Sequence, residues 1–311
     1  MAKTAQNPAD YIVPLNMNGL QGRMLYMKAP KGRNREILFV YGHHSSLERW
    51  FGLMQNLNRY GAVTMPDLPG FGGMDSLYKI GEEASIDRLA DYLASFIKLR
   101  YKRKRVTIAG MSLGFVIVTR MLQRYPDLTK RVDMLVSLAG FAHKDDFTFT
   151  KRRHFMYLSL ARVFSLPVTS SFFRHVILSP LLLKTIYRHT HNAKNKFDGL
   201  VGEELEEMLN FEVHLWHDND VRTYMKTSKE FLTLDNCRVK VDLPVYHVAI
   251  TDDRYFDNHV VEQHFRVIFK DYHELAKLSV GNHAPSVLAD AKAAAPFVPP
   301  KLRRVLLAKQ R

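Results

Sequence analysis

Three residues whose side chains can cooperate in acyl transfer follow predicted strands at separate points of the chain: Ser112, Asp253 and His283. A serine hydroxyl is a poor nucleophile at neutral pH, so it needs an adjacent base to take its proton. A histidine can be that base, and a carboxylate can fix its tautomer and stabilise the imidazolium that forms. Because the carboxyl ends of parallel strands meet at one edge of a sheet, we expect the three side chains to converge there.

Ser112 lies at the centre of a Gly-Met-Ser-Leu-Gly sequence at residues 110–114, between an apolar strand that begins at Val106 and an apolar run typical of a buried helix. A turn this tight strains the serine backbone, and a side chain at either glycine position would collide with neighbouring elements. The serine oxygen would then stand beside the first N–H groups of the helix. The alternative is a glycine-rich turn whose serine caps that helix.

The elements around these residues alternate between strand and helix. A predicted hairpin of residues 11–16 and 23–28 is followed by strands at 36–41, 62–65, 106–110, 134–140, 245–250 and 274–280. Such alternation predicts an α/β fold with a mainly parallel sheet and helices on both faces. Only helical patterns occur between residues 143 and 242. We therefore expect an α/β core of residues 1–142 and 243–311, with residues 143–242 inserted as a helical cap.

Four motifs in this order resemble those of the α/β-hydrolase fold family. They are the strand end at residues 39–43, the Asp-Leu-Pro-Gly-Phe-Gly turn at 67–72, the serine turn at 110–114, and Asp253 followed by Gly-Asn-His-Ala-Pro at 281–285. The resemblance covers nearly the whole chain outside the cap and the two tails. It implies an eight-stranded sheet and a capped serine hydrolase, in which backbone N–H groups of His43 and Leu113 hold the oxyanion.

The assignment of the acid leaves alternatives open. The family usually has glycine three residues before the catalytic carboxylate, and this chain has Ile250 at that position. The carboxylate could therefore lie one residue earlier, so Asp252 is an alternative to Asp253. Asp145 and Asp146 are more distant rivals, because some relatives place the acid after the preceding strand.

The residues near the expected oxyanion site also depart from the family pattern. Tyr41 stands where the family commonly has histidine, although a backbone N–H donor does not depend on that side chain. The side chains of His43 and His44 could contact substrate or have surface or supporting roles. Ser112 argues against haloalkane dehalogenases and epoxide hydrolases, which share the fold and use aspartate at this turn.

We expect an acyl-enzyme on Ser112 that cleaves carboxylic esters of small or medium apolar character. The cap contains many apolar side chains, among them Phe155, Phe172 and Leu181. They could line an acyl-binding pocket or pack the cap helices together and onto the core, and we expect that most of them have the packing role. Thioester hydrolysis, carbon–carbon bond hydrolysis and cofactor-free haloperoxidase chemistry stay open, because a fold does not fix its substrate. A non-catalytic scaffold that binds a ligand or an anionic surface is the alternative from another class.

Composition narrows the class of protein further. With 46% hydrophobic and 24% charged residues, a chain of 311 residues can bury a large core. The single cysteine, Cys237, excludes a disulfide framework and favours a reducing compartment. We find no secretory signal and no membrane-spanning run, and therefore expect a cytoplasmic protein. The histidine-containing stretches 189–191 and 214–218 lack a complete ligand set, so we expect neither metal nor cofactor.

The chain is strongly basic, with a net charge of +14. Six of the eight residues from Lys98 to Arg105 are Lys or Arg, and the segment 301–311 is basic with an apolar stripe. This charge predicts a solvated basic surface, or weak peripheral association of the C-terminal tail with an anionic membrane. No nucleic-acid-binding module is recognisable, so we expect no nucleic acid partner.

Overall fold

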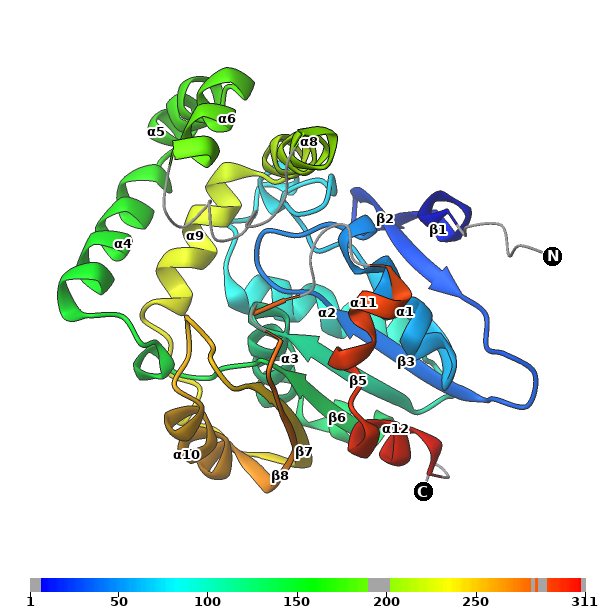
Figure 1. Ribbon diagram of the computed structural model, residues 1–311. Helices are drawn as coiled ribbons and strands as arrows, with labels where there is room; N and C mark the ends of the chain where they lie inside the picture. Colours follow the sequence, from blue (N-terminus) through cyan, green and yellow to red (C-terminus); the bar gives the residue numbers. More distant parts are fainter. Residues whose placement is uncertain (1–6, 190–201, 281–282, 285–289, 309–311) are drawn as a thin grey trace.

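Residues 7–189, 202–280, 283–284 and 290–308 are described by a computed structural model of the protein. Eight strands form one sheet in the order β1-β2-β4-β3-β5-β6-β7-β8 (Figure 1). The strands are β1 (Ile12–Met17), β2 (Leu20–Met27), β3 (Arg35–Val40), β4 (Gly61–Pro66), β5 (Val106–Met111), β6 (Val132–Leu138), β7 (Val241–Ile250) and β8 (Phe269–Leu278). β1 and β2 form an antiparallel hairpin and β2 is antiparallel to β4, whereas every other neighbouring pair is parallel. The predicted α/β fold with a mainly parallel, eight-stranded sheet is confirmed.

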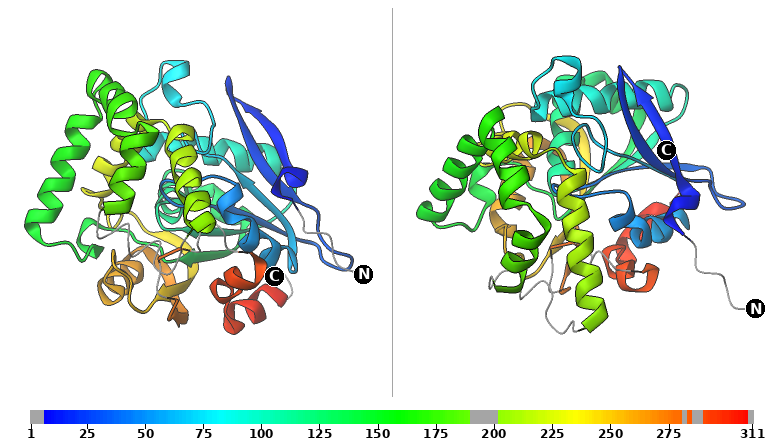
Figure 2. Two further views of the ribbon diagram at one scale, coloured as in Figure 1. Left: turned by 45° about the horizontal axis from the view of Figure 1, so that its top comes forward. Right: turned by 90° about the horizontal axis from the view of Figure 1, so that it is seen from above.

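Helices cover both faces of the sheet (Figures 1 and 2). On one face lie α2 (Ile86–Arg100), α3 (Leu113–Arg124) and α10 (Asn258–Ile268), and on the other α1 (Phe51–Asn58), α11 (Ala291–Ala294) and α12 (Pro300–Leu307). The ring centroids of Phe115 in α3 and Phe265 in α10 are 5.2 Å apart. On the opposite face, Asn56 of α1 donates a hydrogen bond of 2.6 Å to the carbonyl of Ala291. The sheet is thus the middle layer of three.

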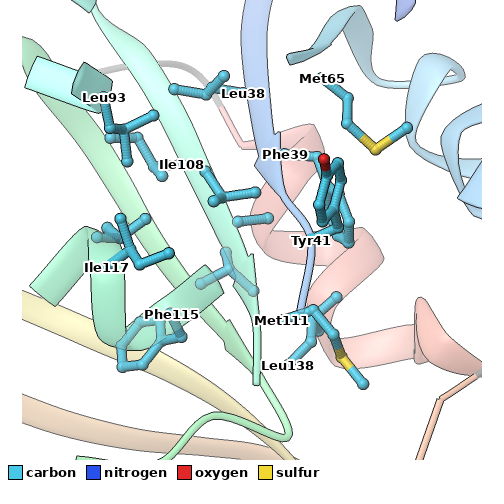
Figure 3. Packing of buried hydrophobic residues seen from close by; sticks show 14 of the residues in the cluster. Leu38, Phe39, Tyr41, Met65, Leu93, Ile108, Met111, Phe115, Ile117 and Leu138 are labelled. Atoms are coloured by element: carbon cyan, nitrogen blue, oxygen red, sulfur yellow. The ribbon is translucent and has the colours of Figure 1, made fainter. Parts of the chain in front are cut away.

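The middle position of the sheet explains the apolar runs of its central strands. All six residues of β5 are buried, because helices cover both of its faces. Figure 3 shows Leu93 of α2 and Ile117 of α3 on one side of β3 and β5, with Phe39 and Met65 on the other. β5 is therefore packed on both faces, and Ser112 follows directly at its carboxyl end.

Between β6 and β7 the described chain forms helices instead of strands. They are α4 (Lys151–Phe164), α5 (Pro167–Phe172), α6 (Pro180–His189), α8 (Gly202–Asp218) and α9 (Val221–Phe231), with a π-helical turn at Phe173–Ile177. In Figure 1, α9 lies between α4 and the sheet. We refer to residues 143–242 as the insertion; its division from the core as a separate cap domain stays a prediction.

The C-terminal helix α12 is fixed to the sheet through a buried arginine. Arg35, at the start of β3, donates to Thr107 Oγ1 and to Asp133 Oδ2, each at 2.7 Å. It also donates to the carbonyls of Leu306 at 3.0 Å and Ala308 at 2.7 Å, at the end of α12.

The apolar stripe of the tail packs on the core, since Leu302 and Leu306 are buried. Membrane association of the tail therefore stays a prediction that rests on the basic side chains alone. Among the described residues, no helix combines the length and apolarity that crossing a bilayer requires.

Candidate active site

Ser112 occupies the turn between β5 and α3 in a strained backbone conformation. Its φ is 50° and its ψ is −121°, a region that residues with a side chain seldom adopt. Although Ser112 is in the N-cap position of α3, its side chain makes no capping hydrogen bond. The alternative of a helix-capping serine is therefore wrong. The hydroxyl is left for another role, and the side chain is partly exposed.

The glycines of this turn are needed because backbone passes close to them. A Cβ at Gly114 would lie 2.2 Å from the carbonyl oxygen of Val40, and a Cβ at Gly110 would lie 2.6 Å from Cα of Phe115. A Cβ at Gly42 would be 3.2 Å from Cβ of Ser112, so the loop after β3 passes directly beside the serine. The crowding predicted at positions 110 and 114 is confirmed.

The same contacts place two backbone segments beside Ser112. Leu113 is the first residue of α3, so its N–H has no acceptor within the helix. His43 follows Gly42 in the loop that borders the serine. These are the two residues whose N–H groups the sequence assigns to the oxyanion.

The side chain of His43 points to the insertion. Its ring stacks on Tyr224 of α9 with centroids 3.9 Å apart, and its Nε2 lies 3.2 Å from the carbonyl oxygen of Tyr224 and 3.1 Å from Oγ1 of Thr227. Because a carbonyl only accepts, Nε2 carries the proton. Burial lowers the pKa of His43 to about 3, so the ring is neutral at physiological pH. The side chain therefore fixes the loop against α9.

The side chain of His44 makes a second link from this loop to the insertion. Nδ2 of Asn219 donates to Nδ1 of His44 at 3.3 Å, and Nε2 of His44 lies 3.7 Å from Oε2 of Glu212, whose side chain is fully buried. The ring of Trp216 packs against that of His44 at 4.1 Å. Nothing local in the sequence points to these partners, because they lie about 170 residues further along the chain.

Asp253 and His283 meet beyond the ends of β7 and β8. Nδ1–H of His283 donates to Oδ2 of Asp253 at 2.6 Å, and Oδ1 of Asp253 accepts the N–H of Tyr255 at 2.8 Å. The Asp253 side chain is 1% exposed, whereas Asp252 is exposed. The structure thus pairs His283 with Asp253 and not with Asp252. The neighbouring motif residues 281–282 and 285 lie outside the described residues.

The more distant rival, Asp146, pairs with a different histidine. Its Oδ1 accepts from Nδ1 of His264 in α10 at 2.5 Å, and its Oδ2 accepts the N–H groups of Ala142 and His143. Asp145 is exposed. Asp146 therefore connects the loop after β6 to α10 and does not contact His283.

Tyr41 lies in a buried network apart from the serine. Its hydroxyl donates to Oδ1 of Asp67 at 2.9 Å and accepts the N–H of Leu68 at 2.9 Å. Burial is the main cause that raises the pKa of Tyr41 well above its usual value, so the phenol stays protonated. The side chain that departs from the family pattern thus supports the turn at residues 67–72.

Aromatic rings surround the histidine side of the site. The His283 ring meets the edges of Tyr255 and Phe256, at 5.2 and 5.3 Å between centroids. Phe256 stacks on Phe141 at 4.6 Å, and Phe231 of α9 contacts Phe141 at 6.1 Å. This apolar cluster extends from the imidazole to the insertion.

The described residues do not contain three or more His, Cys, Asp or Glu side chains grouped to hold a metal ion. Of the two histidine-containing stretches, 214–218 is described, whereas residues 190–191 and the side chain of His189 are not.

Comparisons with known proteins agree with this architecture. A sequence model of the alpha/beta hydrolase fold family matches residues 37–265. No curated protein is significantly similar to the chain in sequence.

Solved structures with a similar fold have low sequence identity to the chain. One is a bacterial membrane phospholipase A, with 14% identity and a TM-score of 0.62, covering 95% of this chain and 85% of the other. Another is a thermophilic esterase from Thermogutta terrifontis, with 13% identity, a TM-score of 0.57 and coverage of 96% and 99%. A third is the N-formylmaleamic acid deformylase from Pseudomonas putida, with 13% identity, a TM-score of 0.58 and coverage of 88% and 94%.

Proposed function

The chain belongs to the α/β-hydrolase fold family, and on this premise we propose that it is a serine hydrolase that forms an acyl-enzyme on Ser112. His283 is the general base, and Asp253 orients it. The observation that carries the proposal is the hydrogen bond of 2.6 Å between Asp253 and His283. The strained conformation of Ser112, whose hydroxyl does not cap α3, supports it further.

In the first half of the reaction, Oγ of Ser112 attacks the ester carbonyl carbon while Nε2 of His283 takes the hydroxyl proton. The carbonyl π electrons move to oxygen, and the resulting oxyanion accepts hydrogen bonds from the N–H groups of Leu113 and His43. Each such donor typically lowers the barrier by ~3 kcal/mol. The carbon–oxygen bond to the alcohol then breaks, and the leaving oxygen takes the proton from His283.

In the second half, water replaces the alcohol. His283 removes a proton from water as the water oxygen attacks the acyl carbon, and it returns that proton to Oγ of Ser112 as the acid leaves. Asp253 accepts from Nδ1–H in both halves, so Nε2 is left unprotonated at the start of each. Its negative charge stabilises the imidazolium that forms twice in each cycle.

The surroundings of His283 favour an apolar substrate. Tyr255 and Phe256 border the imidazole, and Phe141 and Phe231 continue the aromatic surface toward the insertion. Ligand sites built mainly from aromatic and apolar groups bind apolar parts of a substrate by removing them from water. We therefore propose carboxylic esters with small or medium apolar groups as the substrate class.

The test is covalent labelling with a fluorophosphonate, which reacts with activated serines. The intact protein should be labelled on Ser112, and Ser112→Ala should not be labelled. Absence of labelling in the folded intact protein would refute the proposal and favour the non-catalytic scaffold. Matched oxygen and thiol esters of increasing acyl length would then distinguish esterase from thioesterase activity.

A further inference from the structure

The outer helices of the insertion expose many large apolar side chains. Of the 18 large hydrophobic residues that are exposed among the described residues, 11 lie in the 36 residues from Lys151 to Ile186. They are Phe155, Met156, Leu160, Val163, Leu166, Val168, Phe172, Val176, Leu181, Leu182 and Ile186. We refer to this set as the outer patch. The expectation that cap residues such as Phe155, Phe172 and Leu181 pack the helices together is wrong for these residues, because they face solvent.

α4 has apolar residues on two opposite faces. Its inner face packs on α9 and includes Ala161, which is buried, and Tyr157, which is partly buried. Its outer face presents Phe155, which is 68% exposed, and Met156, which is 48% exposed. A surface helix of a monomeric globular protein normally has a polar outer face, and clustered exposed apolar side chains mark an interaction site. The exposed apolar side chains on the outer face of α4 therefore mark it as an interaction surface.

The charges around the outer patch indicate the chemistry of that partner. From Lys151 to Ile186 the sequence has six Lys or Arg residues and no Asp or Glu, although the whole chain has 31 acidic residues. Four of the six, Lys151, Arg152, Arg153 and Arg162, are exposed on α4. None of these four forms an ion pair with a carboxylate among the described residues. A second copy of the same patch would bring like charges together, which disfavours self-association.

We infer that the outer patch docks on an anionic lipid surface, with its apolar side chains in the headgroup and acyl boundary and the α4 cations beside lipid phosphates. Amphipathic helices with large apolar side chains and flanking Lys or Arg bind membranes in this way. α4 lies at the periphery of the molecule in both figures that show the whole fold, on the side of the insertion away from the sheet (Figures 1 and 2). This inference concerns the outer patch and does not depend on the chemistry of Ser112.

The first experiment measures co-sedimentation of the full-length protein with lipid vesicles. Vesicles of phosphatidylcholine alone are compared with an equimolar mixture of phosphatidylcholine and phosphatidylglycerol. Arg152→Glu combined with Arg162→Glu should weaken binding to the anionic vesicles by about tenfold or more. The matched control, Lys102→Glu combined with Arg103→Glu, reverses two exposed charges of the other basic cluster and should bind like the intact protein.

The second experiment tests the apolar part of the patch. Phe155→Ser combined with Leu160→Ser should weaken binding to the same vesicles, whereas Leu99→Ser with Val239→Ser, which removes exposed apolar groups elsewhere, should not. Because all four side chains are exposed, unchanged melting temperatures are expected and confirm that each variant folds. Equal binding to neutral and anionic vesicles, or equal loss in patch and control variants, would overturn the inference. The inference would also be overturned if the intact protein does not bind vesicles and instead forms a dimer in sedimentation velocity that the patch substitutions dissociate.

Discussion

Replacing Asp253 with Asn tests the proposed catalytic pair at a single atom. The carboxylate accepts from Nδ1–H of His283 at 2.6 Å, and the Asp253 side chain is 1% exposed. Water therefore does not screen the attraction between the carboxylate and the imidazolium that forms during the reaction. The amide of Asn removes this charge and can donate to Nδ1, which leaves the proton on Nε2 where the base is needed.

The expected loss follows from these two effects together. In serine triads, an Asp→Asn change of this kind lowers kcat by ~10⁴-fold, which corresponds to a barrier higher by about 5 kcal/mol. Asp252→Asn is the matched control, because it makes the same chemical change one residue away at an exposed position. It should change kcat by less than about twofold.

The assay is hydrolysis of a p-nitrophenyl ester, with kcat and KM measured separately and the fold of each variant checked by circular dichroism. The rate of fluorophosphonate labelling gives a second readout that does not depend on deacylation. If Asp253→Asn keeps more than about a tenth of the intact activity, orientation of His283 by Asp253 is refuted. If Asp252→Asn is the damaging change, the acid lies one residue earlier than we propose.

Three further predictions concern hydrogen-bonded side chains outside the proposed catalytic triad. Tyr41→Phe should lower the free energy of unfolding by about 2–4 kcal/mol in urea titrations, because Oδ1 of Asp67 and the N–H of Leu68 each lose a buried hydrogen-bond partner. Ester hydrolysis by the folded protein should stay nearly unchanged. His264→Gln should remove a pH-dependent part of the stability. The hydrogen bond to Asp146 raises the pKa of His264 in the folded state, so this stabilisation is complete below the unfolded value of about 6.5 and is lost as the pH rises through the folded value. The melting temperatures of the intact protein and of His264→Gln should therefore converge as the pH rises. A difference in melting temperature that does not change with pH would contradict this prediction. Arg35→Met should lower the free energy of unfolding by about 3–5 kcal/mol and make α12 more sensitive to limited proteolysis. If the C-terminus of the variant resists proteolysis as well as that of the intact protein, Arg35 does not fix α12 to the sheet.

The sequence predicts best what depends on neighbouring residues. The strand before Ser112, the glycines of its turn and the mainly parallel sheet all follow from local apolar runs and from steric limits at short range. Those features are confirmed in the fold, because the buried strands have little choice of conformation once both faces are covered.

The pairing of the acid could not be settled from the chain alone. Asp252 and Asp253 differ by one position, and the glycine that marks the register in relatives is replaced by Ile250. In the folded protein the N–H of Thr251 donates to the carbonyl of Leu278 at 2.8 Å, and Nδ2 of Asn258 donates to the carbonyl of Ile250 at 2.7 Å. These bonds fix where the strand ends and so which carboxylate reaches the histidine.

Contacts between distant parts of the chain explain the other differences. The pattern of α4 shows apolar residues on both faces, and only packing on α9 decides which of them face inward. Likewise, the pairing of Asp146 with His264 joins residues 118 positions apart, for which a single sequence has no local signal. Tertiary contacts therefore decide which of several chemically equivalent groups enters the site.

The links from His43 and His44 to the insertion have a consequence for evolution. Both histidines belong to the loop that borders Ser112, yet their partners, Tyr224 and Glu212, belong to helices encoded far downstream. If recombination exchanged the insertion for that of a related protein, the buried Glu212 would be lost together with the groups that hold this loop. The loop and helices α8 and α9 are therefore expected to be inherited as one unit and to change together among descendants of this chain.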